Sequence, residues 1–255
     1  MQTIVLATQK GGSGKSTLAI GLALAAMQDG HTVRLIETDP QGTLSNWKRR
    51  RAEAEPSVEP VAAACEIEQR LEIFDRNGVT LTVIDTAGGV SDLTTAAIRA
   101  ADLCLIPVRP SLIDLEAAAP TLRLARSCNT AFGFVLNQTP VRGQRLDNAS
   151  TALDEGAPLQ SISALAQPCI VMRNDHQDAL GRGLAVGEFA PSGKSAEEIR
   201  GLWQWVSNRL GPVARADAQG VVFDANAPDT VPTMFPLGRT EETATVPEDS
   251  TLDRR

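Results

Sequence analysis

A glycine-rich loop near the start of the chain constrains its fold more than any other feature. The segment Lys10-Gly11-Gly12-Ser13-Gly14-Lys15-Ser16-Thr17 follows an apolar run of strand length, residues 3–7, and precedes an Ala- and Leu-rich run of helix length, residues 17–28. A polyphosphate needs several converging backbone N–H donors, which glycines present well because no side chain stands in the way. The following helix adds its N-terminal N–H groups and the positive end of its dipole. The strand–loop–helix order therefore predicts a phosphate-binding loop.

Four further apolar runs of strand length recur along the chain. They occupy residues 32–36, 81–84, 103–108 and 132–136, and they do not alternate with polar residues. Continuous runs are typical of strands buried on both faces of a parallel sheet. Segments with helical spacing lie between them, among them residues 67–76 and 112–127. This alternation predicts an α/β fold in which helices flank a doubly wound, mostly parallel sheet.

The composition changes at Gly211. Residues 196–210 carry apolar side chains at spacings of three and four, whereas residues 211–255 hold five prolines and four arginines against eight acidic residues. The net charge of −7 thus divides into −4 for the last 45 residues and −3 for the rest. We expect one folded domain over residues 1–210, and an acidic, proline-rich, disordered tail over residues 211–255.

Several classes of protein are disfavoured by the sequence. The longest nearly unbroken apolar run, residues 18–27, is half as long as the roughly 20 residues that a membrane span needs. No signal peptide is recognisable before the first apolar run. The four cysteines form no CxxC pair and lack the spacing of metal ligands. A cytoplasmic protein without a membrane partner is expected.

Three side chains carry the chemistry that such a loop predicts. Lys15 offers a cation to the β- and γ-phosphates of a nucleotide, and Ser16 offers a hydroxyl to Mg²⁺. Asp85 ends an apolar run, in the arrangement that holds Mg²⁺ through water. Gly88-Gly89 follows and either lets the backbone rearrange near the γ-phosphate or forms an ordinary turn. Mg²⁺ and a nucleotide with β- and γ-phosphates are therefore the expected ligands.

The loop departs from the plain GxxxxGK[ST] pattern, because Gln9 replaces its leading glycine and Lys10 precedes the glycine pair. It resembles the deviant Walker A motif, KGGxGK[ST], of the ParA/MinD superfamily of ATPases. The resemblance implies that Lys10 acts across a dimer interface on the partner's nucleotide, while Lys15 acts within its own subunit. It also implies that the nucleotide is held by Gly11, Gly12, Ser13, Gly14, Lys15, Ser16 and Thr17.

Two further segments resemble motifs of this superfamily. In Ile36-Glu37-Thr38-Asp39-Pro40-Gln41, Asp39 matches the second aspartate of the motif D-x-D-P-Q. In the superfamily that aspartate orients the attacking water and interacts with the metal. Glu37 replaces the first aspartate, which leaves the role of a second carboxylate open. Trp47 fits a tryptophan of many small ParA-like proteins or a packing anchor. Asn137, after the strand expected at the edge of the sheet, matches an asparagine that contacts adenine, or simply ends that strand.

Within the superfamily, residues 1–210 resemble the small ParA-like partition ATPases most. This resemblance implies an ATP-dependent homodimer that binds nucleoid DNA without sequence preference. A ParB-like or adaptor partner then stimulates an otherwise slow, Mg²⁺-dependent hydrolysis and releases the dimer, which positions plasmids, chromosomes or protein clusters. An acidic end in place of a basic amphipathic helix disfavours a MinD-like membrane anchor.

Basic residues that could meet DNA phosphates occur in two places. Arg173 and Lys194 fall where relatives present such residues, with Arg182 and Arg200 as further candidates. The densest basic run, Lys48-Arg49-Arg50-Arg51, is either a solvated helix face or a contact for DNA or a partner. Ser195 with Glu198 is interpreted as a capping box at a helix start.

Two alternative functions remain open on the sequence. One is an ATP-dependent synthetase resembling dethiobiotin synthetase, and the other is a ParA-like accessory ATPase for conjugative transfer or cellulose secretion. Lys10 and the segment Asp39-Pro40-Gln41 favour the partition ATPase over the synthetase.

Overall fold

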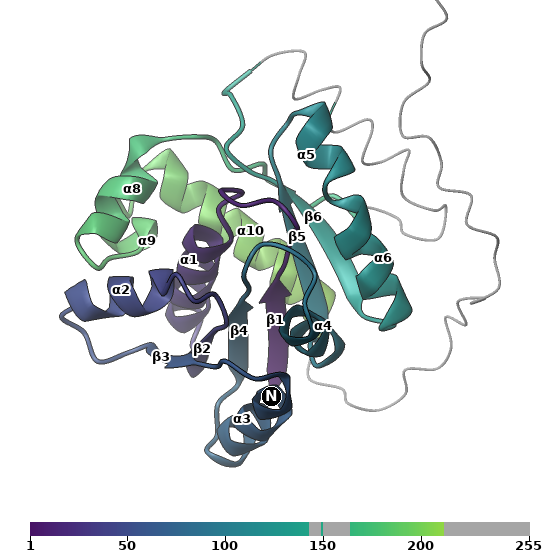
Figure 1. The fold of residues 1–255 in the computed structure, drawn as a ribbon. Coiled ribbons are helices and arrows are strands. Elements are labelled where there is room, and N and C mark those ends of the chain that lie inside the picture. Colours follow the sequence, from purple (N-terminus) through teal and green to yellow (C-terminus); the bar gives the residue numbers. More distant parts are fainter. Residues whose placement is uncertain (143–148, 150–163, 212–255) are drawn as a thin grey trace, which may run out of the picture.

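Six parallel strands form the sheet, in the order β3-β2-β4-β1-β5-β6 (Figure 1). The computed structural model describes residues 1–142, 149 and 164–211. The strands are β1 (Gln2–Leu6), β2 (Val33–Glu37), β3 (Ser57–Pro60), β4 (Leu81–Asp85), β5 (Leu103–Val108) and β6 (Ala131–Leu136). The helices are α1 (Lys15–Gln28), α2 (Thr43–Arg50), α3 (Ala64–Arg76), α4 (Asp92–Arg99), α5 (Leu112–Glu116), α6 (Ala119–Ser127), α8 (Asn174–Gly181), α9 (Val186–Phe189) and α10 (Lys194–Leu210).

The parallel, doubly wound sheet predicted from the sequence is confirmed. Every strand pair is parallel, and the five predicted strands are present to within one residue at each end. The edge strand β3 was missed, because Val58 is its one large apolar residue and Pro60 ends it. A proline is tolerated there since an edge strand need not donate every backbone N–H.

Two apolar layers cover the two faces of the sheet. Along β1, Ile4 and Leu6 face the layer that includes α1, α9 and α10. Val5 faces the layer that includes α3, α4 and α6. Both sets are buried because successive strand residues point to opposite faces. This explains why the strands read as unbroken apolar runs.

Two helix predictions are wrong in detail. The helix expected over residues 112–127 is divided into α5 and α6, because Pro120 stands at the second position of α6 and cannot continue a preceding helix. The capping box of Ser195 and Glu198 does not form, since α10 begins at Lys194 after Gly193. Ser195 Oγ instead donates to Asp175 on α8.

The edge of the sheet at β6 is partly covered by the chain around residues 164–172. Phe134 N donates to Ala164 O, and Ile170 N donates to Leu136 O. None of the helices in the described ranges is long and apolar enough to cross a membrane. The expected tail, residues 211–255, lies outside the described residues apart from Gly211, and the division of the chain at residue 210 stays a prediction.

Candidate nucleotide-binding site

The glycine-rich loop joins the central strand β1 to α1 at the carboxyl edge of the sheet, where open α/β folds bind their ligands. Gly12 and Gly14 have φ values of 75° and 89°, which side chains rarely allow. The first turn of α1 holds no acidic residue, and no side chain caps it. Its N–H groups and positive dipole end are thus available to an anion, as the sequence predicts.

Lys15, Asp39 and Asp85 come together beside this loop. Asp85 is the register partner of Leu6 on one side and of Glu37 on the other, so β4 places it next to the start of the loop. Burial lowers the pKa of Lys15, while the carboxylates of Asp85 and Asp39 oppose that change. The cation and both carboxylates predicted from separate motifs therefore form one site.

Asp85 carries the signature of a cation site. Its side chain is wholly buried, and none of the well-formed hydrogen bonds between described residues reaches either carboxylate oxygen. Burial raises the pKa of Asp85 to about 7, although the neighbouring Ser16 hydroxyl and the Lys15 cation act against that rise. An orphaned buried carboxylate is costly unless it meets a cation. Asp85 therefore fits Mg²⁺, which proteins hold through one or two carboxylates together with substrate phosphates.

Replacement of Asp85 by asparagine should stabilise the nucleotide-free protein as the pH rises. A raised carboxyl pKa favours folding at low pH and costs stability as the pH rises from the unfolded pKa, roughly 4, to about 7. Asparagine avoids that cost, which reaches at most about 4 kcal/mol. Thermal unfolding at pH 5.5 and pH 8 should show Asp85→Asn gaining on the wild type at the higher pH. The exposed control Asp178→Asn should differ from the wild type by the same melting temperature at both pH values. The same behaviour in Asp85→Asn would contradict a buried charge at Asp85.

Glu37, the residue that departs from the family motif, has a structural role. Its buried carboxylate accepts hydrogen bonds from Leu44 N at 2.5 Å and Ser45 N at 3.1 Å, the second and third residues of α2. A carboxylate on these free N–H groups caps a helix and contributes about 1 kcal/mol. Glu37 thus fixes α2, and with it Trp47, which is fully buried and donates to Leu184 O at 3.1 Å.

Lys10, at the start of the loop, forms an ion pair with Asp114 on α5. Its Nζ atom is 3.3 Å from Oδ2 of the buried Asp114, and its side chain is 33% exposed. Arg109 binds the same carboxylate at 3.0 Å, through Oδ1. Burial alone would raise the pKa of Asp114, but hydrogen bonds from Ser111, Arg109 and Lys10 hold it below its usual value. Sequence reasoning missed Asp114, which is 104 positions from Lys10.

Gly88 packs directly against the loop. A Cβ at this position would lie 3.3 Å from the carbonyl oxygen of Gln9, so a side chain would press on the loop backbone. Gly89 N donates to Thr8 O at 3.4 Å, and its φ is 107°. The pair therefore lies against the phosphate loop, where the sequence places a switch segment or a turn.

Asn137 reaches the site by a different contact from the one expected. Its buried Nδ2 donates to Ser13 O at 2.7 Å, and its Oδ1 accepts from Gln138 N at 2.9 Å. The side chain thus holds the phosphate loop in this structure. The contact with adenine stays a prediction.

The two expected DNA-binding residues differ in their surroundings. Arg173 is paired with Glu198 at 2.7 Å, and both side chains are mostly covered. Lys194 begins α10, is exposed, and takes part in none of the ion pairs between described residues. Arg200 donates to Pro191 O, and Arg182 stacks on Phe189. Lys194 is thus the freer cation for a phosphate.

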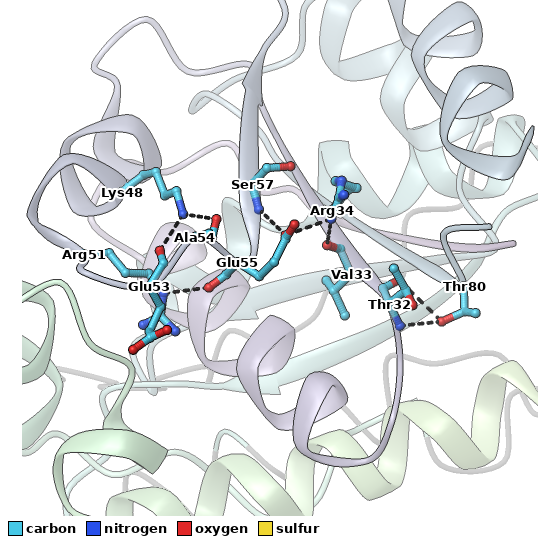
Figure 2. A network of polar contacts seen from close by, with 10 residues as sticks. All are labelled: Thr32, Val33, Arg34, Lys48, Arg51, Glu53, Ala54, Glu55, Ser57 and Thr80. Atoms are coloured by element: carbon cyan, nitrogen blue, oxygen red, sulfur yellow. Dashed lines mark hydrogen bonds and ion pairs between the residues drawn. The ribbon is translucent and has the colours of Figure 1, made fainter. Parts of the chain in front are cut away.

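The basic run at the end of α2 is divided between contacts within the protein and the surface. Figure 2 shows Lys48 donating to the carbonyls of Glu53 and Ala54, and Arg51 donating to that of Glu55. Arg51 also forms two hydrogen bonds to Glu188 and is nearly buried. Lys48 and Arg51 therefore hold the connection to β3 in place. Arg49 and Arg50 remain exposed.

The chain is similar to known proteins in sequence and in fold. The model of the VirC1 protein family matches residues 1–152. The virC1 protein of Rhizobium rhizogenes is 33% identical over 177 residues, which cover 66% of this chain and 76% of that protein. The maintenance of carboxysome distribution protein A of Halothiobacillus neapolitanus is 28% identical over 205 residues, covering 77% and 91%.

A solved structure supports the fold independently. The ATP complex of a Cyanothece McdA variant superposes with a TM-score of 0.66 at 18% identity, covering 85% of this chain and 99% of that one. The family model spans more than half of this sequence. The chain therefore belongs to the VirC1 family, within the ParA/MinD superfamily of P-loop partition and positioning ATPases.

Proposed function

We propose that the protein is a positioning ATPase that forms a homodimer on binding ATP and Mg²⁺, binds DNA without sequence preference, and leaves it after hydrolysis. The observation that carries the proposal is Lys10, a partly exposed cation at the start of the phosphate loop that is paired with Asp114. A lysine so placed can exchange one anion for another, and a nucleotide on a facing subunit would supply that anion.

The surface around the loop supports a second copy of the chain as the partner. Apart from Ile73 on α3, the large apolar side chains that are exposed in the described part lie near the carboxyl ends of strands. Val90, Leu112, Ile113 and Val141 follow such ends in the chain, and Met172 lies beside the segment after β6, where its N donates to Thr139 O. Apolar side chains gathered on one edge are typical of an association surface. Two copies that meet through this edge would bring each Lys10 toward the partner's loop.

Each site residue then has a defined task. The loop and the first turn of α1 bind the phosphates, and Lys15 neutralises their charge. Asp85 would hold Mg²⁺ with Ser16, and Mg²⁺ would neutralise charge developing on the phosphates. Asp39, half-buried beside Lys15, would orient the attacking water. Because Lys10 comes from the other subunit, hydrolysis should be slow until the dimer, and then a ParB-like or adaptor protein, completes the site.

The DNA contact is proposed for the segment from Arg182 to Arg200. Lys194 and Arg200 on α10, with Arg182 after α8, present charges that no carboxylate pairs within the described residues. Arg173 would have to exchange Glu198 for a phosphate. Dimerisation doubles this basic surface, which favours DNA binding in the ATP state and hence an association with the nucleoid.

Lys194→Ala should weaken DNA binding and its dependence on salt. Each phosphate contact contributes about 0.9 to the slope of log affinity against log salt, so a dimer that loses two contacts should lose nearly 2 from the slope. Fluorescence anisotropy with an arbitrary duplex, with ATP, with ADP and without nucleotide at several salt concentrations, measures this.

The matched control is Arg123→Ala. Arg123 is exposed on α6, which covers the opposite face of the sheet from α10. That variant should bind DNA like the wild type. DNA binding that is independent of ATP, or a slope that Lys194→Ala leaves unchanged, would contradict the proposed surface.

A further inference from the structure

Two amide side chains that follow β6, those of Asn137 and Gln138, donate hydrogen bonds to the backbone of the phosphate loop. We call this pair the clamp. Asn137 donates to the carbonyl oxygen of Ser13 at 2.7 Å, and Gln138 donates through Nε2 to the carbonyl oxygen of Gly12 at 2.9 Å. The two residues are also linked to each other, since Gln138 N donates to Asn137 Oδ1. These hydrogen bonds fix the orientation of two successive carbonyl groups in a glycine-rich loop.

The orientation of these carbonyls sets the orientation of the donors that follow them. In a planar trans peptide, the C=O of one residue and the N–H of the next point to opposite sides. Carbonyls of Gly12 and Ser13 turned toward β6 therefore turn the N–H groups of Ser13 and Gly14 away from it. No hydrogen bond among the described residues uses either N–H group as a donor, so both are available to an anion.

The fit between the clamp and the loop is close. A Cβ on Gly14 would lie 2.3 Å from Nδ2 of Asn137, so only glycine allows the loop to approach. Gln138 itself has a φ of 53°, a left-handed conformation that costs a non-glycine residue energy. The backbone of Asn137 is anchored to β5 by its hydrogen bond to Val108 O at 2.8 Å.

We propose that Asn137 and Gln138 are positioning residues that aim the N–H groups of Ser13 and Gly14 at the phosphate chain, independently of the base. This inference rests on the proposed function, because it requires that the loop bind nucleotide. It differs from an adenine contact in what it predicts. Loss of the clamp weakens every ligand that carries the phosphates, by the same factor.

The test compares three ligands in the presence of Mg²⁺: ATP, GTP and base-free tripolyphosphate. Gln138→Asn tolerates the left-handed backbone and keeps an amide, but it is too short to reach Gly12. We expect its affinity for all three ligands to fall about five- to tenfold, as for one lost hydrogen bond. Asn137→Asp, which faces the Ser13 carbonyl with an acceptor, should lose more than tenfold for all three.

Gln138→Gly separates positioning from stability. It relieves the strained φ, so the nucleotide-free protein should unfold at a temperature no lower than the wild type, yet it should bind ATP less tightly. If Asn137→Asp fails to fold, the two Gln138 variants carry the test. A loss confined to ATP, or no loss in the Gln138 variants, would overturn the clamp. Absence of ATP binding by the wild type would instead refute the proposed function.

Discussion

Lys15→Ala should weaken ATP binding by roughly 100-fold or more, because a charged hydrogen bond to an ion is worth about 1.5–3 kcal/mol and the lysine also neutralises the phosphates through space. Lys15 is buried and interacts with the carboxylates of Asp85 and Asp39. Without Lys15, the negative charges of these two carboxylates would repel the phosphates more strongly. Isothermal titration calorimetry with ATP and Mg²⁺ measures the loss directly.

The control for this prediction is Lys194→Ala. Lys194 is an exposed lysine at the start of α10, far along the chain from the loop. Its removal should leave the affinity for ATP unchanged. An ATP affinity of Lys15→Ala equal to that of the wild type would contradict the assignment of the loop.

Lys10→Ala and Asp114→Asn should move dimerisation in opposite directions. Lys10→Ala removes the cation proposed for the partner's nucleotide, so ATP should still bind, while the dimer and hydrolysis are lost. Asp114→Asn removes the charge that holds Lys10 in the monomer. Releasing a lysine from a nearly buried carboxylate has an energetic cost, so the variant should dimerise at about tenfold lower protein concentration.

Glu116→Gln is a suitable control for Asp114→Asn. Glu116 lies two residues further on, at the end of α5, and is exposed. The dependence of ATP hydrolysis on protein concentration reports dimerisation for all three variants. If hydrolysis by Asp114→Asn and by the wild type reached half its maximum at the same protein concentration, the ion pair would not restrain Lys10. Hydrolysis retained in Lys10→Ala would contradict the action of Lys10 across the interface.

Local sequence was sufficient to predict five of the six strands, together with Lys15 and Asp85 of the candidate site. The strands are continuous apolar runs because both faces of a parallel sheet are covered. The loop and Asp85 each follow such a run directly. Since the carboxyl ends of parallel strands meet at one edge, residues from β1, β2 and β4 could be expected together before any contact was known.

The remaining features depend on contacts between distant segments. Glu37 occupies a motif position associated with catalysis, but the start of α2 folds back onto it and makes it a cap. Glu198, expected to cap α10, instead binds Arg173 and accepts from Val171 N, because residues 171–173 pass beside that helix. The ion pair of Lys10 with Asp114 likewise depends on how β5 neighbours β1. No local pattern reports such pairings.

ATP is proposed to assemble two copies of this chain through the edge that carries Lys10. Sedimentation equilibrium of the wild-type protein with Mg²⁺ measures this assembly, with a slowly hydrolysed ATP analogue, with ADP and without nucleotide. We expect a mass near twice the 27.0 kDa of one chain with the analogue, and a monomer in the other two samples. A mass that is the same in all three samples, whether monomer or dimer, would contradict it.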